Sequence, residues 1–434
     1  MYNIIAFFSF SLFIRLIFIL SHNHSSEGLI EDELMYWNNT MLLLKQGYVK
    51  SSIAAERMTG IFYYYKILFF LSMNNFKVLL ILQAAIDSLT CVVLYKTSET
   101  IFPKQKKIIL LFAIFSPLMI ILSSQILTET IFLFFFSLFL YFSIKFITLK
   151  NNYFLNIALA GIFLGLSTTI RSITFPLILL SIIPFSIIFF KRQFYYYKAI
   201  LMSLTFLLLA LLPISQRLIN NFKVYGTFSL TNQTGTHLAY WVVPMILTET
   251  KNISRDEAIA IINDVKSKYS FTQNSYKNDL VLRKVSFEVL SKENKLDIFY
   301  YWMRGGFLNL ISPSILLDKN IRSLPHPSYY EVGELLKWVK LILENKEYYS
   351  YLISILVASF TSIFTLISFI IGPIYILKKN RMIFFITILY VLYFLIITGP
   401  VLSPKYIFPI LPCIFLYQGI TLYKIKNTIK YFKK

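Results

Sequence analysis

Long apolar runs separated by short polar segments dominate the hydrophobic pattern of this chain. A helical run of about 20 apolar residues is long enough to cross a hydrocarbon layer of about 30 Å. The pattern predicts ten spans, some of them shorter than this, at 2–20, 76–95, 108–122, 126–144, 154–170, 173–190, 199–216, 351–377, 382–398 and 406–423. No small-x-small cleavage site follows the first run, so we expect an uncleaved first helix.

Two long polar segments interrupt the spans, at 21–75 and 217–350. In the first, Asp32 to Gln46 is predicted to form an amphipathic helix that ends at Gly47. The apolar, tyrosine-rich stretch 61–71 is predicted to lie along the membrane surface.

The second polar segment opens with the turn-rich stretch 231–241 and continues with helical patterns. Ser254 starts a capping box with Glu257, which predicts a helix to about Tyr269. Two more helices are predicted at 277–290 and 297–310. We therefore expect an all-α, polytopic integral membrane protein. Its parts are an N-terminal transmembrane region at 1–216, a small helical external domain at 217–350 and a C-terminal transmembrane region at 351–434.

The composition is typical of a polytopic membrane protein, and the distribution of charge indicates how the spans are oriented. The 434 residues are 57% hydrophobic and 15% charged, with a net charge of +21. Lysine and arginine gather in alternate short loops and in the C-terminal tail, as the positive-inside rule requires of cytoplasmic segments. These bases are Lys96, Lys104, Lys106, Lys107, Lys145, Lys150, Lys191, Arg192, Lys198, Lys378, Lys379, Arg381, Lys424, Lys426, Lys430, Lys433 and Lys434. Both termini are predicted to be cytoplasmic, and 21–75 and 217–350 to be external.

The absence of several motifs narrows the function. No recognition helix or RNA-binding module is visible, so the positive charge does not indicate nucleic acid. No Walker sequence, Rossmann glycine fingerprint, CxxC or HExxH is present, which excludes transport by a built-in ATPase. Cys91 and Cys413 each lie inside an apolar run, so we expect reduced, packed thiols.

Three consecutive carboxylates, Glu31, Asp32 and Glu33, lie just outside the first predicted span in a chain with few acids. They are consistent with first-turn acids that stabilise a helix N-terminus. They also fit a general base that takes the proton of an attacking hydroxyl, or ligands for a divalent cation. We favour the second interpretation because Tyr36 and Trp37 follow and supply either surface on which a sugar can stack or anchors at the membrane interface.

Further polar residues are predicted at the external ends of other spans. Glu129 is either a helix cap or a group that holds an acceptor or a metal ion. Arg171 lies in a short turn, where it either reaches lipid headgroups or binds a phosphate. Lys405 and Arg57 have the same two interpretations. Asp87 lies inside a span and needs an internal partner, which favours a structural role.

The order of these residues resembles the GT-C superfamily of polytopic glycosyltransferases, especially the branch of protein O-mannosyltransferases and aminoarabinose transferases. Asp32, Glu33 and Tyr36 match an Asp-Glu-x-x-Tyr element of the first external loop, with Gly47 at the end of its helix. Glu129 and Arg171 resemble the acid of the second external loop and the arginine that ends the fifth span. Four residues resemble the C-terminal Arg-Tyr-x-x-Pro-x-x-Pro element, with lysine in place of the arginine: Lys405, Tyr406, Pro409 and Pro412.

The resemblance implies transfer of a sugar from a polyprenyl-phosphate donor to a lipid, glycan or protein acceptor. The active site would lie on the external face of a membrane, expected to be a bacterial inner membrane, and the reaction would invert the anomeric carbon. Asp32 would accept the proton of the acceptor, with Glu33 as the next candidate, while Arg171 and Lys405 neutralise the departing phosphate. The cofactor is unknown, with a divalent cation as the candidate.

Two other functions remain open from the sequence. A polymerase or ligase of surface polysaccharide would also have many spans and one large external segment, but it predicts arginine-rich external loops. A flippase or transporter predicts broken helices with paired intramembrane charges and related halves, and the sequence contains no internal repeat.

Overall fold

The computed structural model describes residues 2–22, 24–149 and 151–432. Within these ranges it contains helices and loops but no β-strand. The first half of the chain forms α1 (Tyr2–Ser21), α2 (Glu31–Gln46), α3 (Ser51–Glu56), α4 (Gly60–Leu71), α5 (Phe76–Ile101), α6 (Lys106–Ile114), α7 (Pro117–Ser123), α8 (Glu129–Thr148), α9 (Tyr153–Ile170), α10 (Phe175–Leu180), α11 (Ile182–Lys191) and α12 (Tyr196–Tyr225).

The second half forms α13 (Thr234–His237), α14 (Val243–Lys251), α15 (Arg255–Ser267), α16 (Ser275–Ser291), α17 (Lys295–Ile311), α18 (Lys319–Arg322), α19 (Tyr329–Val332), α20 (Leu335–Glu344), α21 (Tyr349–Lys379), α22 (Arg381–Thr398) and α23 (Leu411–Phe432). A π-helical turn at Leu238–Val242 joins α13 to α14, and the 3₁₀ segment η6 (Pro404–Ile410) leads into α23.

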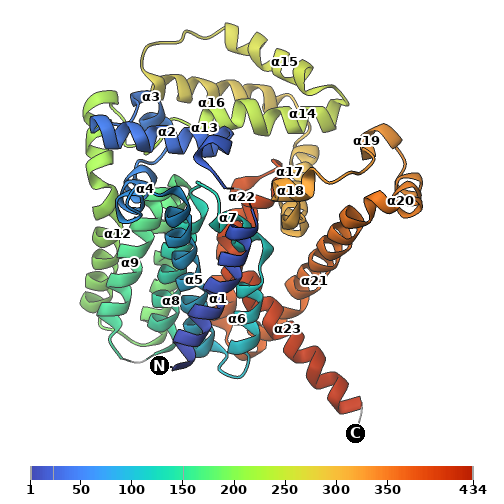
Figure 1. Cartoon of the computed structure of the whole chain (residues 1–434). Helices are drawn as coiled ribbons and strands as arrows, with labels where there is room; N and C mark the ends of the chain where they lie inside the picture. Colours follow the sequence, from blue (N-terminus) through green and yellow to red (C-terminus); the bar gives the residue numbers. More distant parts are fainter. Residues whose placement is uncertain (1, 23, 150, 433–434) are drawn as a thin grey trace.

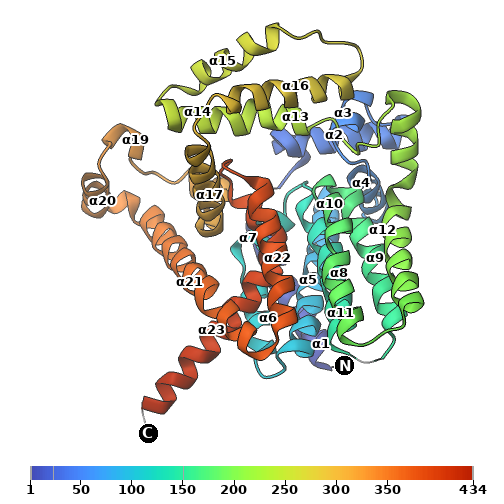
Figure 2. The same ribbon diagram turned by 180° about the vertical axis from the view of Figure 1, so that it is seen from behind.

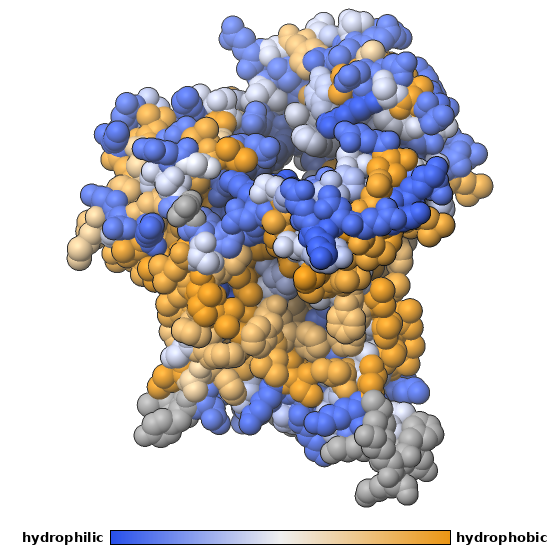
Figure 3. All heavy atoms as spheres, turned by 45° about the vertical axis from the view of Figure 1, so that its right-hand side comes forward, coloured by the Kyte–Doolittle hydropathy of each residue, from blue (hydrophilic) through white to orange (hydrophobic). Residues whose placement is uncertain are grey.

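Apolar helices make this chain an integral membrane protein with many spans. Among the described residues, nine helical stretches are long and apolar enough to cross a membrane, or ten if the bent pair α6 and α7 counts as one span. This agrees with the ten spans predicted. A broad apolar band separates two hydrophilic ends of the molecule (Figure 3).

The span predicted at 108–122 is broken, with α6 and α7 inclined by 48°. Ser116 accepts a hydrogen bond from the Met119 amide and Pro117 occupies the first turn of α7, a sequence that starts a new helix. The break leaves carbonyls of α6 without helical partners. The guanidinium of Arg15 donates to two of them, Ala113 O (3.4 Å) and Ile114 O (3.0 Å).

Arg15 of α1 also pairs with Asp87 of α5, and both side chains are fully buried. The Arg15 Nε to Asp87 Oδ2 distance is 2.6 Å. The internal partner that Asp87 requires is therefore an arginine of the first span. This pair fastens α1, α5 and the α6–α7 break together, which confirms structural pairing for Asp87.

The two ends of the bundle differ (Figure 1). One end is covered by α2 to α4 and by a layer formed by α13 to α16, and we call it the capped end. The other end carries the N-terminus and the C-terminus of the chain. Figure 2 shows α21, α22 and α23 grouped on one side of the bundle, with the last part of α23 extending away from it.

The layer over the capped end has a hydrophobic core of its own. Side chains of the π-helical turn, α14, α15 and α16 form it, among them Ile246, Ile262 and Val285, all with no exposed surface. Val401, from the loop between α22 and η6, joins this core and connects the layer to the spans.

Several helices of the capped end were predicted and others were not. α2 ends at Gly47 with a left-handed φ of 80°, and α4 fills the stretch predicted at 61–71. The capping box of Ser254 and Glu257 opens α15 as expected. The stretch 231–241, which was predicted to be rich in turns, is helical from Thr234 onward. Its apolar side chains form part of the hydrophobic core of the layer over the capped end.

Candidate functional site

Helix α2 places the three acids of the first loop at its start. Glu31, Asp32 and Glu33 form its first turn, where carboxylates interact favourably with the helix dipole. Tyr36 lies four residues after Asp32 and therefore on the same face of the helix. That face turns inward after the first turn, since Tyr36 and Thr40 are both buried.

Asp32 is paired with Arg57 and keeps an exposed carboxylate. The Arg57 Nη2 to Asp32 Oδ1 distance is 3.3 Å, and half of the Asp32 side chain is exposed. Arg57 directly follows α3, and residues of other segments donate hydrogen bonds to two backbone carbonyls of α3. Arg217 of α12 donates to Ala54 O, and the Asn232 amide donates to Ala55 O at 3.1 Å.

Glu33 has a different environment from its neighbour. It is buried, and both of its carboxylate oxygens have partners. Oε1 accepts the Ile126 amide at 3.1 Å, and Oε2 lies 3.2 Å from the Lys319 Nζ of α18. Glu33 thus joins α2 to the loop before α8 and to the large external segment.

Glu129 and Arg171 form a second ion pair. Glu129 is buried at the first position of α8, and its Oε1 lies 3.1 Å from Arg171 Nη1. The Thr128 hydroxyl donates to the other oxygen at 3.0 Å. The Arg171 guanidinium also lies over the Phe132 ring, 5.6 Å from its centroid.

The loop that presents Glu129 is fixed by buried polar side chains. Gln83 of α5 donates to Ser123 O and Gln125 O at 2.8 and 2.7 Å. The Tyr65 hydroxyl donates to Leu127 O at 2.6 Å. Together with Glu33 on the Ile126 amide, these bonds engage four backbone groups of residues 123–127 and hold this loop in place.

Tyr36 brings the two ion pairs into one site. Burial raises the pKa of its phenol to about 12, while the Arg57 and Arg171 charges lower it and the Asp32 and Glu129 charges raise it. All four charged groups therefore act on one hydroxyl. We call Asp32, Arg57, Glu129 and Arg171 the four-charge cluster.

Two further residues lie within electrostatic range of this cluster. Tyr406 of η6 interacts with Arg171, Asp32, Arg57 and Glu129. The pKa of His237 in α13 is lowered by burial and by the Arg57 charge. Segments from both halves of the chain thus meet at the capped end, where Figure 3 shows the surface hollowed beneath the upper layer.

Lys405 and Trp37 complete the residues singled out from the sequence. Lys405 precedes Tyr406, is half-buried, and forms no ion pair with any carboxylate that the structure describes. Trp37 packs edge-on against Phe69 and Phe76, with ring centroids 5.8 and 5.3 Å away. It joins α2 to α4 and α5.

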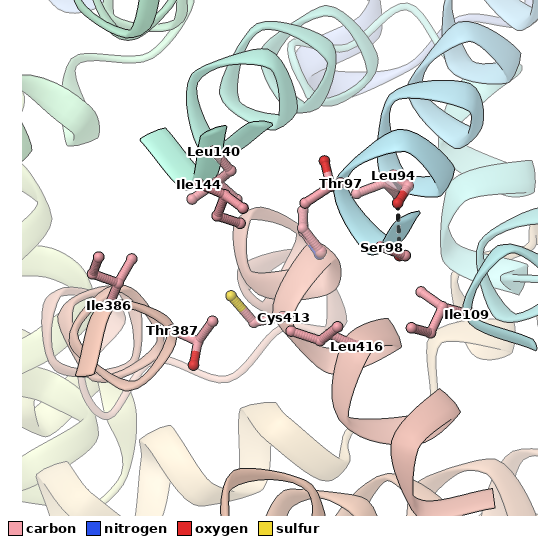
Figure 4. A pocket seen from close by; sticks show the side chains of 11 residues that line it. Leu94, Thr97, Ser98, Ile109, Leu140, Ile144, Ile386, Thr387, Cys413 and Leu416 are labelled. Atoms are coloured by element: carbon pink, nitrogen blue, oxygen red, sulfur yellow. Dashed lines mark hydrogen bonds between the residues drawn. The ribbon is translucent and has the colours of Figure 1, made fainter. Parts of the chain in front are cut away.

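A small enclosed cavity lies elsewhere in the bundle (Figure 4). Its lining includes Thr97, Ser98, Thr387 and Cys413, in the half of the spans that is remote from α2. The volume of about 30 Å³ suits a water molecule and no substrate. The cavity is therefore separate from the four-charge cluster.

Within residues 2–22, 24–149 and 151–432, no group of three or more His, Cys, Asp and Glu side chains is placed to hold a metal ion. Asp32 and Glu129 each face an arginine instead.

Comparison with known proteins finds weak structural likeness and no sequence match. No protein-family model matches the chain, and no curated protein matches it. A solved structure that resembles it is the crystal structure of ArnT from Cupriavidus metallidurans in the apo state. The two are 10% identical, with 90% of this chain and 73% of that chain covered and a TM-score of 0.36.

Proposed function

We propose that this protein is a membrane glycosyltransferase of the GT-C type that uses a polyprenyl-phosphate sugar as its donor. The observation that carries the proposal is the four-charge cluster around Tyr36 at the capped end. One exposed carboxylate, two arginines and the hydroxyls of Tyr36 and Tyr406 occur together there, and Lys405 directly precedes Tyr406 in the chain. The donor tail would lie among the spans and its phosphate at their end.

Asp32 is the best candidate for the base. Its carboxylate is half exposed and has one partner, whereas both oxygens of Glu33 are occupied by Ile126 and Lys319. In the proposed step, an acceptor hydroxyl loses its proton to Asp32 and its oxygen attacks the anomeric carbon. The bond from that carbon to the phosphate oxygen breaks, and the configuration inverts.

Cations at the site would stabilise the phosphate as it leaves. The charges of Asp32 and Arg57 cancel, and so do those of Glu129 and Arg171. Lys405 then supplies a positive charge that no described carboxylate neutralises. A phosphate that gains negative charge as its bond to the sugar breaks is stabilised by a cation held in this way.

The proposal is tested with the full chain in proteoliposomes supplied with a panel of polyprenyl-phosphate sugars. We expect Asp32→Asn to lower kcat by about a hundredfold or more, the range for loss of a general base, with donor binding retained. Glu31→Gln is the matched control, because it removes an exposed carboxylate one position away. Full turnover by Asp32→Asn would move the base elsewhere, with Glu33 examined next. No transfer from any lipid-linked donor by the unmodified chain would reject the proposal.

A further inference from the structure

A groove opens between α21 and α23 at the end of the molecule that carries both termini. The two helices touch where Gly372 faces Tyr417, since a Cβ on Gly372 would lie 2.6 Å from the Tyr417 Cβ. Beyond this contact α23 extends away from the bundle (Figures 1 and 2). The groove has a volume of about 470 Å³.

The lining of the groove combines apolar walls with two lysines. Ile371, Ile374 and Lys378 follow one face of α21 at helical spacing, and Ile425 belongs to α23. Lys424 reaches across from α23, with its ammonium 4.5 Å from the centroid of the Tyr375 ring of α21.

No carboxylate of this part of the chain can neutralise these lysines, because residues 351–434 contain neither Asp nor Glu. Lys378 and Lys424 also form no ion pair with an acid elsewhere in the portion that the structure describes. Two exposed ammonium groups without an acidic partner among the described residues, at the mouth of an apolar groove between spans, match a ligand that is anionic at one end and apolar at the other.

We infer that this groove binds an anionic glycerophospholipid, with the phosphate between Lys378 and Lys424 and an acyl chain along Ile371 and Ile374. Basic pockets between transmembrane helices bind anionic headgroups in this manner. A general attraction of lysines to the membrane surface would need neither the groove nor the contact of Lys424 with Tyr375. The inference is independent of the proposed transferase activity.

The test titrates phosphatidylglycerol into the detergent-purified full chain and counts bound lipids by native mass spectrometry. Phosphatidylcholine serves as the comparison lipid. We expect Lys378→Gln/Lys424→Gln to weaken phosphatidylglycerol binding by about tenfold or more, given the contribution of single basic residues to anionic lipid binding. Lys426→Gln is the matched control, since Lys426 lies two residues beyond Lys424, is exposed and does not line the groove.

A second variant separates a lipid from a free phosphate. Ile374→Trp keeps both lysines and fills the apolar wall at a position that is already half exposed, so it should weaken lipid binding while the chain still folds. Undiminished phosphatidylglycerol binding by the double lysine variant would overturn the inference. So would an equal loss in Lys426→Gln, or competition by inorganic phosphate with no effect of Ile374→Trp.

Discussion

At the scale of single residues, charge balance separates the candidate phosphate ligands. Arg57 and Arg171 each face a carboxylate, and Lys405 faces none among the described residues. Under the proposed function, we therefore predict that an anionic donor headgroup would gain most from Lys405. Arg171 contributes differently, because its removal would also leave Glu129 as an uncompensated, buried negative charge next to the donor.

We predict that Lys405→Gln raises the donor KM about tenfold, the loss expected for a hydrogen bond to a charged group. Lys50→Gln, which removes an exposed lysine of the first loop, should leave the donor KM unchanged. Steady-state kinetics with a lipid-linked donor measure both values.

The role of Arg171 can be determined by comparing the donor kinetics of Arg171→Gln with those of the double variant Glu129→Gln/Arg171→Gln. If Arg171 binds the phosphate, the double variant remains impaired. If it only neutralises Glu129, the double variant recovers. Donor kinetics unchanged in Arg171→Gln would leave Arg171 with a headgroup contact alone.

We predict that His24 makes the stability of the capped end depend on pH. Burial, followed by the charges of His22, Lys319 and Lys77, lowers its pKa from 6.5 to about 4, and its Nε2 is buried without a hydrogen-bond partner. Below pH 6.5 His24 becomes protonated in the unfolded chain, whereas in the folded chain it stays neutral down to about pH 4. The unfolded state then holds more protons, so stability falls as the pH decreases through this window.

We predict that His24→Gln reduces this loss of stability. Between pH 7.5 and pH 5, the melting temperature of the variant should therefore fall by less than that of the unmodified chain. His326→Gln, at a histidine stacked on Tyr351, serves as the control. Parallel melting curves for His24→Gln and the unmodified chain across the window would show that His24 does not couple folding to pH.

Which residues form the site was predictable to a limited extent. Local patterns singled out Asp32, Glu129 and Arg171, because acids and arginines at the ends of spans are rare, and the structure brings them together with Tyr36 in the candidate site. The distinct environments of Asp32 and Glu33 were not predictable, since Lys319 lies 286 positions from Glu33. Arg15 was also missed, although a buried Asp87 in α5 requires a partner in some other span.

At the scale of elements, α9 and α12 pack unusually closely, and glycine makes this possible. A Cβ on Gly161 would lie 2.6 Å from Phe206 O, and one on Gly165 would lie 2.5 Å from Ala210 O. The two glycines are four residues apart, the spacing that lets transmembrane helices approach each other. Because α9 ends at Ile170, this contact supports the position of Arg171.

We predict that Gly165→Leu destabilises the chain by about 1–3 kcal/mol through overpacking and lowers turnover by displacing Arg171. Thr205→Leu, which adds apolar volume to α12 at an exposed hydroxyl, should have neither effect. Denaturant unfolding and donor kinetics on the same preparations measure the two effects. Unchanged stability in Gly165→Leu would show that the helices separate without cost.

Elements were predicted more completely than contacts. Apolar length alone gave every span, because a membrane helix must satisfy its backbone internally over about 20 residues. The break between α6 and α7 was not predicted, although Ser116 and Pro117 form a helix-start signal inside the run. α14 was missed because its apolar positions pack in the core of the α13–α16 layer and not on the spans.

At the scale of the whole molecule, the chain places its unusual charges at one end and its termini at the other (Figure 1). The four-charge cluster, α18 and the α13–α16 layer share the capped end. The positive-inside pattern predicts that this end faces away from the cytoplasm. Sidedness decides the donor, because nucleotide sugars are made in the cytoplasm and a site on the far side must receive its sugar on a lipid.

Single cysteines test this sidedness. Cys91 and Cys413 are both buried, so an impermeant maleimide should label the unmodified chain weakly. We predict that Asp264→Cys, on α15, is labelled in intact cells, and that Lys104→Cys, between α5 and α6, is labelled only after permeabilisation. Both positions are exposed, so a difference in labelling reports the side of the membrane and not burial. The reverse pattern would place the four-charge cluster in the cytoplasm, where a lipid-linked donor is not required, and the case for Asp32 as the base of a polyprenyl-phosphate transferase would then lose its main support.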